Sequence, residues 1–286
     1  MAKMEMWIFC PALNFMTMMR CCTVETMKTH VTNIVLGFIC VGLAILIAIF
    51  TARFFVKGKS SERGIYRYAL AFANSGYMGD PLVLVLFGET VLSYYKFYCL
   101  PINLLTYTWG LNELIPRTEQ KGGTLKRLLN APMIAMLFGV LAGLLGIGAV
   151  LPAFVIDSLD TLKSCMGPVA MLLAGVTIAK YNFVGMLKKK KVYAASLFRL
   201  LFIPALLLAC MFVIVRVAGI PTDVLFLIFF AVATPLGLNT VVFPEAYGGD
   251  AETGASMTMI SHTLGIVSIP LMYALMVALF GTPFGG

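Results

Sequence analysis

Long apolar runs with at most one charged or histidine residue recur along this chain, and they constrain its fold more than any other feature. A helix of about 20 apolar residues spans the hydrocarbon core of a bilayer. Continuous runs are typical of such helices, whereas the strands of a membrane β-barrel alternate apolar and polar residues. We therefore predict nine membrane segments, at residues 7–19, 31–52, 69–87, 91–111, 128–156, 165–179, 192–215, 224–243 and 255–280.

The composition excludes several classes of protein. Hydrophobic residues make up 60% of the chain and charged residues 12%, about half the charge of a soluble domain. The net charge of +8 does not indicate nucleic-acid binding, because the basic residues fall between apolar runs and form no basic face. The seven cysteines lie scattered, mostly in apolar runs, and no Cys or His spacing indicates a metal or cofactor. We expect the lipid bilayer as partner and no nucleic acid.

The basic residues predict an orientation in the membrane. Most of the 21 Lys and Arg residues lie in three connections, at 53–67, 117–127 and 180–191, which alternate with poorly charged connections. The positive-inside rule then places the basic connections in the cytoplasm and the C-terminus outside. We expect a multi-pass protein of the plasma or inner membrane. The run 188–191 is interpreted as a topology anchor, with lipid-headgroup binding as the alternative.

A weak internal repeat relates the two halves of the chain. Residues 9–13 resemble 166–170, and residues 73–78 resemble 234–239 at a similar offset. Four predicted segments lie in the first half and five in the second, so a five-helix unit would lack its first helix. An odd number of helices inverts the second copy, and inverted repeats are typical of secondary transporters. We predict a first repeat at 1–115, a cytoplasmic linker at 116–127 and a second repeat at 128–286.

Two apolar segments are interrupted at corresponding places. The first interruption covers residues 72–81 and includes Asn74, Gly76, Asp80 and Pro81. Proline breaks or kinks a helix, and freed backbone groups at membrane depth must line a cavity or find partners. The second interruption, at 233–240, includes Pro235, Gly237 and Asn239. Paired breaks predict a substrate site, and their half-helix N-termini suit a carboxylate. Ordinary kinks with asparagines bonded to a neighbouring helix are the alternative.

Other polar residues at membrane depth are also candidates for function, most of them with a structural alternative. Asp80 is interpreted as a proton carrier or site carboxylate, or as a cap on a half-helix. Lys96 attracts an anion, pairs with Asp80 or extends to the interface. His262 is a candidate proton relay, or else bonds a neighbouring helix. Asn14, just after a proline, is expected to line the pocket. Asn103, Thr106 and Thr108 are expected to bond between helices, with a lesser chance of touching substrate.

Several motifs together resemble the auxin efflux carrier family, within the superfamily of bile-acid/sodium symporters. The segment 74–82 is similar to the signature of that family's fourth helix, and 233–237 with 245–248 and 269–271 is similar to its ninth and tenth. Residues 168–175 and 11–13 resemble its seventh and second helices. The likeness covers nearly the whole chain.

The resemblance implies a fold of two inverted five-helix repeats, here without the first helix, in which the fourth and ninth helices are broken and cross. Helices 1, 2, 6 and 7 would form a scaffold, and the others a mobile domain that carries substrate in an elevator-like shift. Asn74, Pro81, Pro235 and Asn239 would lie at the crossing. The implied function is secondary transport of a small carboxylate such as malate, malonate or an auxin-like acid. A homodimer through the scaffold helices is left open.

Two departures from the family pattern weaken this reading. Asp80 stands where the family usually has an apolar residue. The chain also begins where the second helix would begin, so a truncated or non-transporting membrane protein is an alternative. A sodium-coupled symporter of the bile-acid type is another, although few acidic residues lie at depth to bind sodium. An intramembrane enzyme is not expected, because no catalytic motif surrounds His30 or His262.

Overall fold

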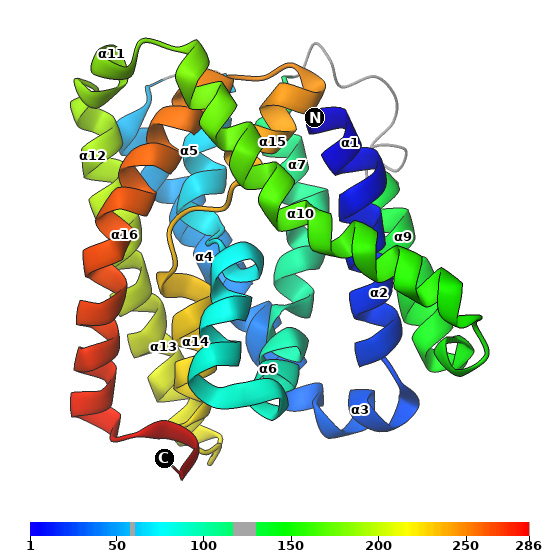
Figure 1. Cartoon of the computed structure of the whole chain (residues 1–286). Helices are drawn as coiled ribbons and strands as arrows, with labels where there is room; N and C mark the ends of the chain where they lie inside the picture. The colour runs from blue at the N-terminus through cyan, green and yellow to red at the C-terminus, as the bar shows by residue number, and fades with distance from the viewer. Residues whose placement is uncertain (58–60, 117–129, 286) are drawn as a thin grey trace.

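The structure, a computed structural model, describes residues 1–57, 61–116 and 130–285 (Figure 1). Within these ranges the chain is built of helices, and strand-like pairing is limited to one isolated bridge. The first half contains α1 (Ala2–Met4), η1 (Glu5–Phe9), α2 (Cys10–Cys21), α3 (Val24–Thr29), α4 (Val31–Phe55), α5 (Ser61–Ala71), η2 (Ser75–Gly79), α6 (Asp80–Leu105), η3 (Thr106–Gly110) and α7 (Leu111–Leu114). The second half contains α9 (Ala131–Leu144), η4 (Ile147–Ala149), α10 (Ala153–Lys180), α11 (Phe183–Leu187), α12 (Lys190–Leu197), η5 (Phe198–Phe202), α13 (Ile203–Val217), α14 (Val224–Ala233), α15 (Asn239–Tyr247), α16 (Ala251–Phe280) and η6 (Pro283–Gly285).

The helices confirm an all-α, multi-pass membrane protein. Large apolar side chains such as Phe54, Phe138, Phe154 and Val217 are exposed on their outer faces, where only lipid can accept so much apolar surface. In the described part, five helical stretches are long and apolar enough to cross a bilayer: Val31–Phe55, Ser75–Leu114, Ala153–Lys180, Lys190–Val217 and Ala251–Phe280. Two shorter apolar helices are Ala131–Leu144 and Val224–Ala233.

One predicted span is wrong. The uncharged run 128–156 does not form a single helix, because α9 ends at Leu144 and α10 begins at Ala153. Gly146 adopts the left-handed conformation, at φ 67°, that a glycine accepts without strain. Pro152 then stands as the N-cap of α10. The turn was not predicted because its residues are as apolar as the helices on either side. The linker beyond Pro116 and the predicted start of the second repeat at 128 lie outside the described residues.

Helix α10 also starts earlier than predicted. The segment predicted at 165–179 extends back to Ala153, so that Lys163 lies inside a long helix and not in a connection. The predicted segments 69–87 and 224–243 are both interrupted, as their glycines and prolines indicated. The first begins at Ser61 with α5, breaks after Ala71 and resumes as η2 and α6. The second consists of α14, an extended break and α15.

Each helix that follows a break reaches a glycine at positive φ. The stretch that begins at Ser75 turns at Gly88, where φ is 81° inside α6. Helix α15 ends at Gly248, where φ is 76°. In both cases a side chain would strain the backbone. The two breaks therefore share a sequence of features, namely an extended segment, a helix and a glycine at positive φ.

The helices pack as two groups. In one, α2 packs extensively against α9 and α10. In the other, α4 packs on α5 and α6, α13 on α14, and α16 on α12 and α15. Figure 1 shows α1, α2 and α9 along one side of the molecule, with α10 running diagonally from that side across the view toward α11. Contacts between the groups are fewer and come mainly from α10, α1 and η1.

A buried arginine closes the end of one broken helix. Arg199 is only 2% exposed, and its Nη1 donates a hydrogen bond of 2.7 Å to the carbonyl oxygen of Val232 in the last turn of α14. The last carbonyls of a helix lack partners within it and carry partial negative charge, so a cation is stabilising there. No acidic residue pairs with Arg199 among the described ion pairs.

Replacing Arg199 by Ala is expected to destabilise the protein, because the carbonyl of Val232 loses its charged donor. Losing a hydrogen bond from a charged group costs about 1.5–3 kcal/mol. The measurement is thermal unfolding of the purified protein in detergent. The exposed Arg216, changed to Ala in the same way, is the control, and equal unfolding temperatures for the two variants would contradict the role of Arg199.

Candidate functional site

The two helix breaks meet and bond to each other. Ala73 and Leu236 form an isolated antiparallel bridge. The N–H of Asn74 donates to the carbonyl oxygen of Pro235 at 2.7 Å, and the N–H of Gly237 donates to that of Phe72 at 3.4 Å. Backbone groups freed by the breaks thus satisfy one another, as hydrocarbon surroundings require. The crossing joins residues that lie far apart in sequence.

Two helices start beside the crossing. The carbonyl oxygen of Asn74 accepts hydrogen bonds of 3.1 Å from the N–H groups of Met78 and Gly79, so the helix begins directly after it. The N–H groups of its first turn, from Ser75 to Tyr77, have no helical partner and carry partial positive charge. On the other side α15 begins at Asn239. Both helix starts are held by side chains from neighbouring helices.

Those supporting bonds come from Tyr95 and Ser261. The hydroxyl of Tyr95 donates to the carbonyl oxygen of Ser75 at 3.0 Å. The hydroxyl of Ser261 on α16 accepts the N–H of Leu236 at 3.2 Å. Both side chains are buried, so each bond fixes a piece of broken backbone against a neighbouring helical segment.

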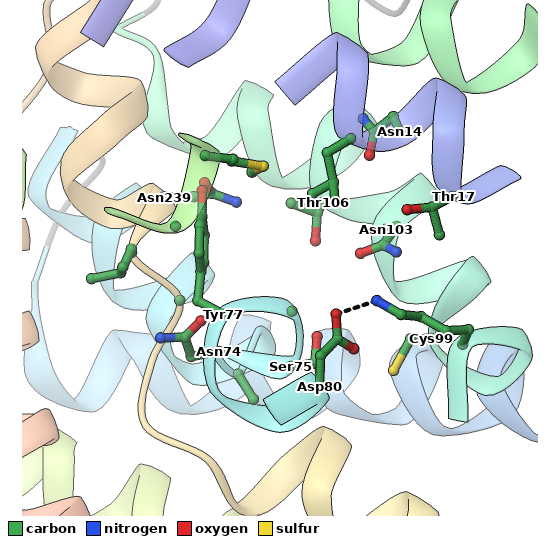
Figure 2. A pocket seen from close by; sticks show the side chains of 18 of the residues that line it. Asn14, Thr17, Asn74, Ser75, Tyr77, Asp80, Cys99, Asn103, Thr106 and Asn239 are labelled. Atoms are coloured by element: carbon green, nitrogen blue, oxygen red, sulfur yellow. Dashed lines mark hydrogen bonds and ion pairs between the residues drawn. The ribbon is translucent and has the colours of Figure 1, made fainter. Parts of the chain in front are cut away.

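A cavity of about 430 Å³ lies at the crossing. Figure 2 shows Asn74, Tyr77 and Asn239 on one side of it and Asn14, Thr17 and Asn103 on the other, with Asp80 directed toward the space between them. The first packing group contributes residues of α2 and α10, and the second contributes the rest. The lining residues are Leu13, Asn14, Thr17, Tyr68, Ala73, Asn74, Ser75, Gly76, Tyr77, Asp80, Pro81, Leu84, Leu92, Lys96, Cys99, Asn103, Thr106, Tyr107, Lys163, Met166, Gly167, Gly237, Leu238 and Asn239.

The asparagines of the two breaks are held in equivalent ways. The amide nitrogen of Asn74 donates to Nε2 of His262 at 3.2 Å, and Nδ1 of His262 donates to the carbonyl oxygen of Thr258 at 2.8 Å. The amide nitrogen of Asn239 donates to the hydroxyl of Tyr68 at 3.1 Å. Both side-chain carbonyl oxygens are buried and lack a partner within the described structure. Buried polar atoms are normally bonded, so both oxygens remain available as acceptors.

Two cations and one carboxylate face the cavity. Asp80 and Lys96 form an ion pair, drawn as a dashed line in Figure 2. Lys163 reaches the cavity from α10. Its only described ion pair is a long one of 3.9 Å to Asp160, whose other oxygen pairs with Arg20. The charge of Lys96 is balanced by Asp80, and the cavity keeps an excess of positive charge.

Most of the predicted site residues come together in this cavity. Asn14, Asn74, Gly76, Asp80, Pro81, Lys96, Gly237 and Asn239 all line it. Pro235 does not, because its ring packs behind the crossing against Gly265, where an added Cβ would lie 2.6 Å from Cγ of Pro235. His262 does not line it either and instead supports Asn74 from behind. Its interhelical hydrogen bond is the alternative reading given from the sequence.

Asn14 plays a second part that the sequence did not indicate. Its amide nitrogen donates to the carbonyl oxygen of Pro132 at 3.2 Å, which ties α2 to the first turn of α9. Asn14 is 3% exposed, so this bond fixes one wall of the cavity. The predicted pairing of Lys96 with Asp80 is present.

Sequence reasoning missed several lining residues. Tyr68, Tyr77 and Lys163 were not singled out, and Thr106 was expected mainly to bond between helices. Tyr68 lies on α5 before the break, and no local motif marks it. Lys163 was placed in a connection because the run that follows it is short. A charged residue inside the longer helix Ala153–Lys180 is the signal that would have identified it.

Comparison with protein families identifies the chain. The family model described as membrane transport protein matches residues 1–273. The chain belongs to the auxin efflux carrier family. This family member matches no curated protein in a separate comparison. Membership agrees with a membrane transport protein whose polar cavity is buried among apolar helices.

The pair of Asp80 and Lys96 in this family member is testable by a double-mutant cycle. Breaking a fully buried ion pair costs roughly 3–5 kcal/mol. These side chains are 23% and 21% exposed, so we expect Asp80→Asn and Lys96→Gln each to destabilise the protein by about 1–3 kcal/mol.

The double variant should recover part of that loss, because neither charge is then left alone. Unfolding of the four proteins in detergent gives the coupling energy. Additive effects of the two changes would show that the pair contributes nothing to stability.

Proposed function

We propose that this protein is a secondary transporter of a small organic anion, with its site at the crossing of the two broken helices. The observation that carries the proposal is the cavity of about 430 Å³. It contains polar side chains from both breaks at membrane depth, and in transporters such breaks surround the substrate. Membership of a membrane transport family supports transport as the activity.

The electrostatics of the cavity favour an anion. The unpaired N–H groups of the helix that starts at Ser75 face it with partial positive charge. Lys163 adds a full charge that its long contact with Asp160 satisfies poorly. An incoming carboxylate can bond these donors and also compete with Asp80 for Lys96.

The volume of the cavity suits a small solute. Pockets that bind drug-sized ligands measure about 300–1,000 Å³, and this one lies toward the lower end. We propose a carboxylate such as malate, malonate or an auxin-like acid. The unpartnered oxygens of Asn74 and Asn239 would accept a hydroxyl or N–H of the solute, or a water that accompanies it.

The two packing groups suggest how the solute moves. The cavity takes Leu13, Asn14 and Thr17 from α2 and Lys163, Met166 and Gly167 from α10, and its remaining walls from the second group. We propose that the second group shifts relative to the first in an elevator-like movement and carries the crossing with it. In this view α2, α9 and α10 are the scaffold.

The matching breaks also support a pair of inverted repeats. In each half an extended segment precedes a helix that reaches a glycine at positive φ, Gly88 or Gly248. The antiparallel direction of the bridge between Ala73 and Leu236 is the relation expected across a twofold axis in the membrane.

Uptake into proteoliposomes tests the transport proposal. We expect radiolabelled malate, malonate or indole-3-acetate to accumulate, and Asn74→Ala and Asn239→Ala each to lower uptake about tenfold, the equivalent of roughly one hydrogen bond. Thr263→Ala on the exposed face of α16 is the matched control. Folded protein that moves none of the three acids would contradict the proposal. Uptake that requires sodium would favour the symporter alternative.

The orientation is open to an equally direct test. Figure 1 shows α11, which precedes the run Lys188–Lys191, at the opposite end of the molecule from the C-terminus. We propose that the α11 end faces the cytoplasm. Alkaline phosphatase fused after Gly286 should then be active in bacterial cells, because it folds only outside the cytoplasm. If the phosphatase fusion is inactive and green fluorescent protein fused at the same position is fluorescent, the C-terminus is cytoplasmic and the assignment is reversed.

A further inference from the structure

Glu5 is a buried carboxyl group with no cation beside it. It lies in η1 and is 0% exposed. Its Oε1 accepts a hydrogen bond of 3.1 Å from the hydroxyl of Tyr77, and its Oε2 has no partner within the described structure. The sequence analysis passed over Glu5 because it stands close to the start of the chain, ahead of the first apolar run.

The surroundings of Glu5 offer no compensating positive charge. Helix α9 contains no charged residue, and Lys3 on α1 is exposed. On α10 and α15, Lys180 pairs with Glu245 at 2.9 Å, and Lys163 contacts Asp160. The described ion pairs include none to Glu5.

The other titratable neighbours of Glu5 are weak acids. Besides Tyr77 these are Cys10, one turn further along the same rod, and Tyr107, whose hydroxyl lies 3.5 Å from Sγ of Cys10. Helix α15 carries Tyr247 and also Glu245, which is paired with Lys180. None of these groups supplies a positive charge. An ionised carboxylate here would lose its hydration and gain only one hydrogen-bond donor, and that burial costs free energy. The pocket therefore favours the neutral carboxylic acid.

Glu5 and Tyr77 also connect the two packing groups. Glu5 belongs to the rod of η1 and α2, in the proposed scaffold, and Tyr77 belongs to the helix that follows the first break. Tyr77 lines the cavity, so the bond runs from the cavity wall into the scaffold. Both residues lie in π-helical turns, η1 and η2, and π-turns are frequent at functional sites.

We propose that Glu5 is the proton-binding site that couples transport to pH, and that its bond with Tyr77 links protonation to the movement of the broken helix. This inference rests on the proposed function. While Tyr77 donates to Oε1, the proton resides on Oε2. Movement of the Tyr77 helix opens the carboxyl to water in the cavity, where hydration stabilises the carboxylate and the proton passes to that water. One proton then accompanies each cycle, bound and released by the same carboxyl.

Asp80 is a weaker candidate for this role in the structure. Its charge is matched by Lys96 within the same packing group, so the pair would travel together in an elevator movement. The bond of Glu5, in contrast, must break in that movement. His262 is held by Asn74 and Thr258, both of the second group. Glu5 is thus the titratable group whose environment changes most.

Infrared difference spectroscopy of the purified full-length protein tests the proton directly. Wild-type protein at neutral pH should show the carbonyl band of a protonated carboxylic acid. Glu5→Gln should lack the band, and Glu89→Gln, at an exposed position, should retain it. A wild-type spectrum without a band that Glu5→Gln removes would overturn the proposal. This measurement does not depend on transport of any anion.

Uptake into proteoliposomes tests the coupling. The labelled acid is supplied outside the vesicles and is the one of the three that wild-type protein takes up most. Wild-type protein and Glu89→Gln should accumulate label down an inward proton gradient, with uptake falling about tenfold per pH unit above the midpoint, as for one proton. Glu5→Gln imitates the neutral acid and should exchange label across the membrane without accumulating it. Accumulation by Glu5→Gln equal to that of wild type would overturn the proposal.

Tyr77→Phe tests the link to the helix. Removing the hydroxyl takes a donor from the carboxyl, so the pH profile of uptake should shift to higher pH, and an unchanged profile would contradict the part given to Tyr77. If wild-type protein moves no anion in any gradient, the proposed function fails. The infrared band then decides separately whether Glu5 holds a proton.

Discussion

Backbone polar groups at membrane depth must find partners inside the protein, and this requirement organises the molecule. Two helices stop midway and free their N–H and carbonyl groups. The breaks satisfy each other through the bridge between Ala73 and Leu236, and Arg199 satisfies the end of α14. Tyr95 and Ser261 hold the segments around them. The N–H groups that remain unpaired at the helix starts face the cavity. The same breaks that the fold must stabilise therefore also provide the binding site.

Among the described residues, several charged side chains at membrane depth follow a similar rule, and Glu5 departs from it. Asp80 lies against Lys96, and Arg67 bonds Glu113 at 3.2 Å. Arg199 uses a helix end in place of an acidic partner. Glu5 has only the hydroxyl of Tyr77. A group that departs from such a rule at low dielectric is a candidate for function, because its cost must be offset by what it does.

Much of this arrangement could be predicted from the sequence. Uncharged runs predicted the membrane helices, and the glycines and prolines near Asn74 and Pro235 predicted both breaks, because these residues act locally on the backbone. The turn between α9 and α10 was missed because apolar residues continue through it. Lys163 was missed because its helix was predicted too short, and Glu5 because it stands ahead of the first apolar run. Tyr68 was missed for a different reason, since its role depends on which helices pack together and local sequence does not encode that contact.

The pairing of the two breaks also has a consequence for biogenesis. The backbone N–H of Asn74 finds its acceptor only in Pro235. The first break therefore stays incomplete until most of the chain has been synthesised. Contacts between such distant residues form late and slowly. Until then the first half of the chain keeps unpaired peptide groups while it is still attached to the ribosome. The helices can assemble fully only after the segment around Leu236 has been synthesised and inserted.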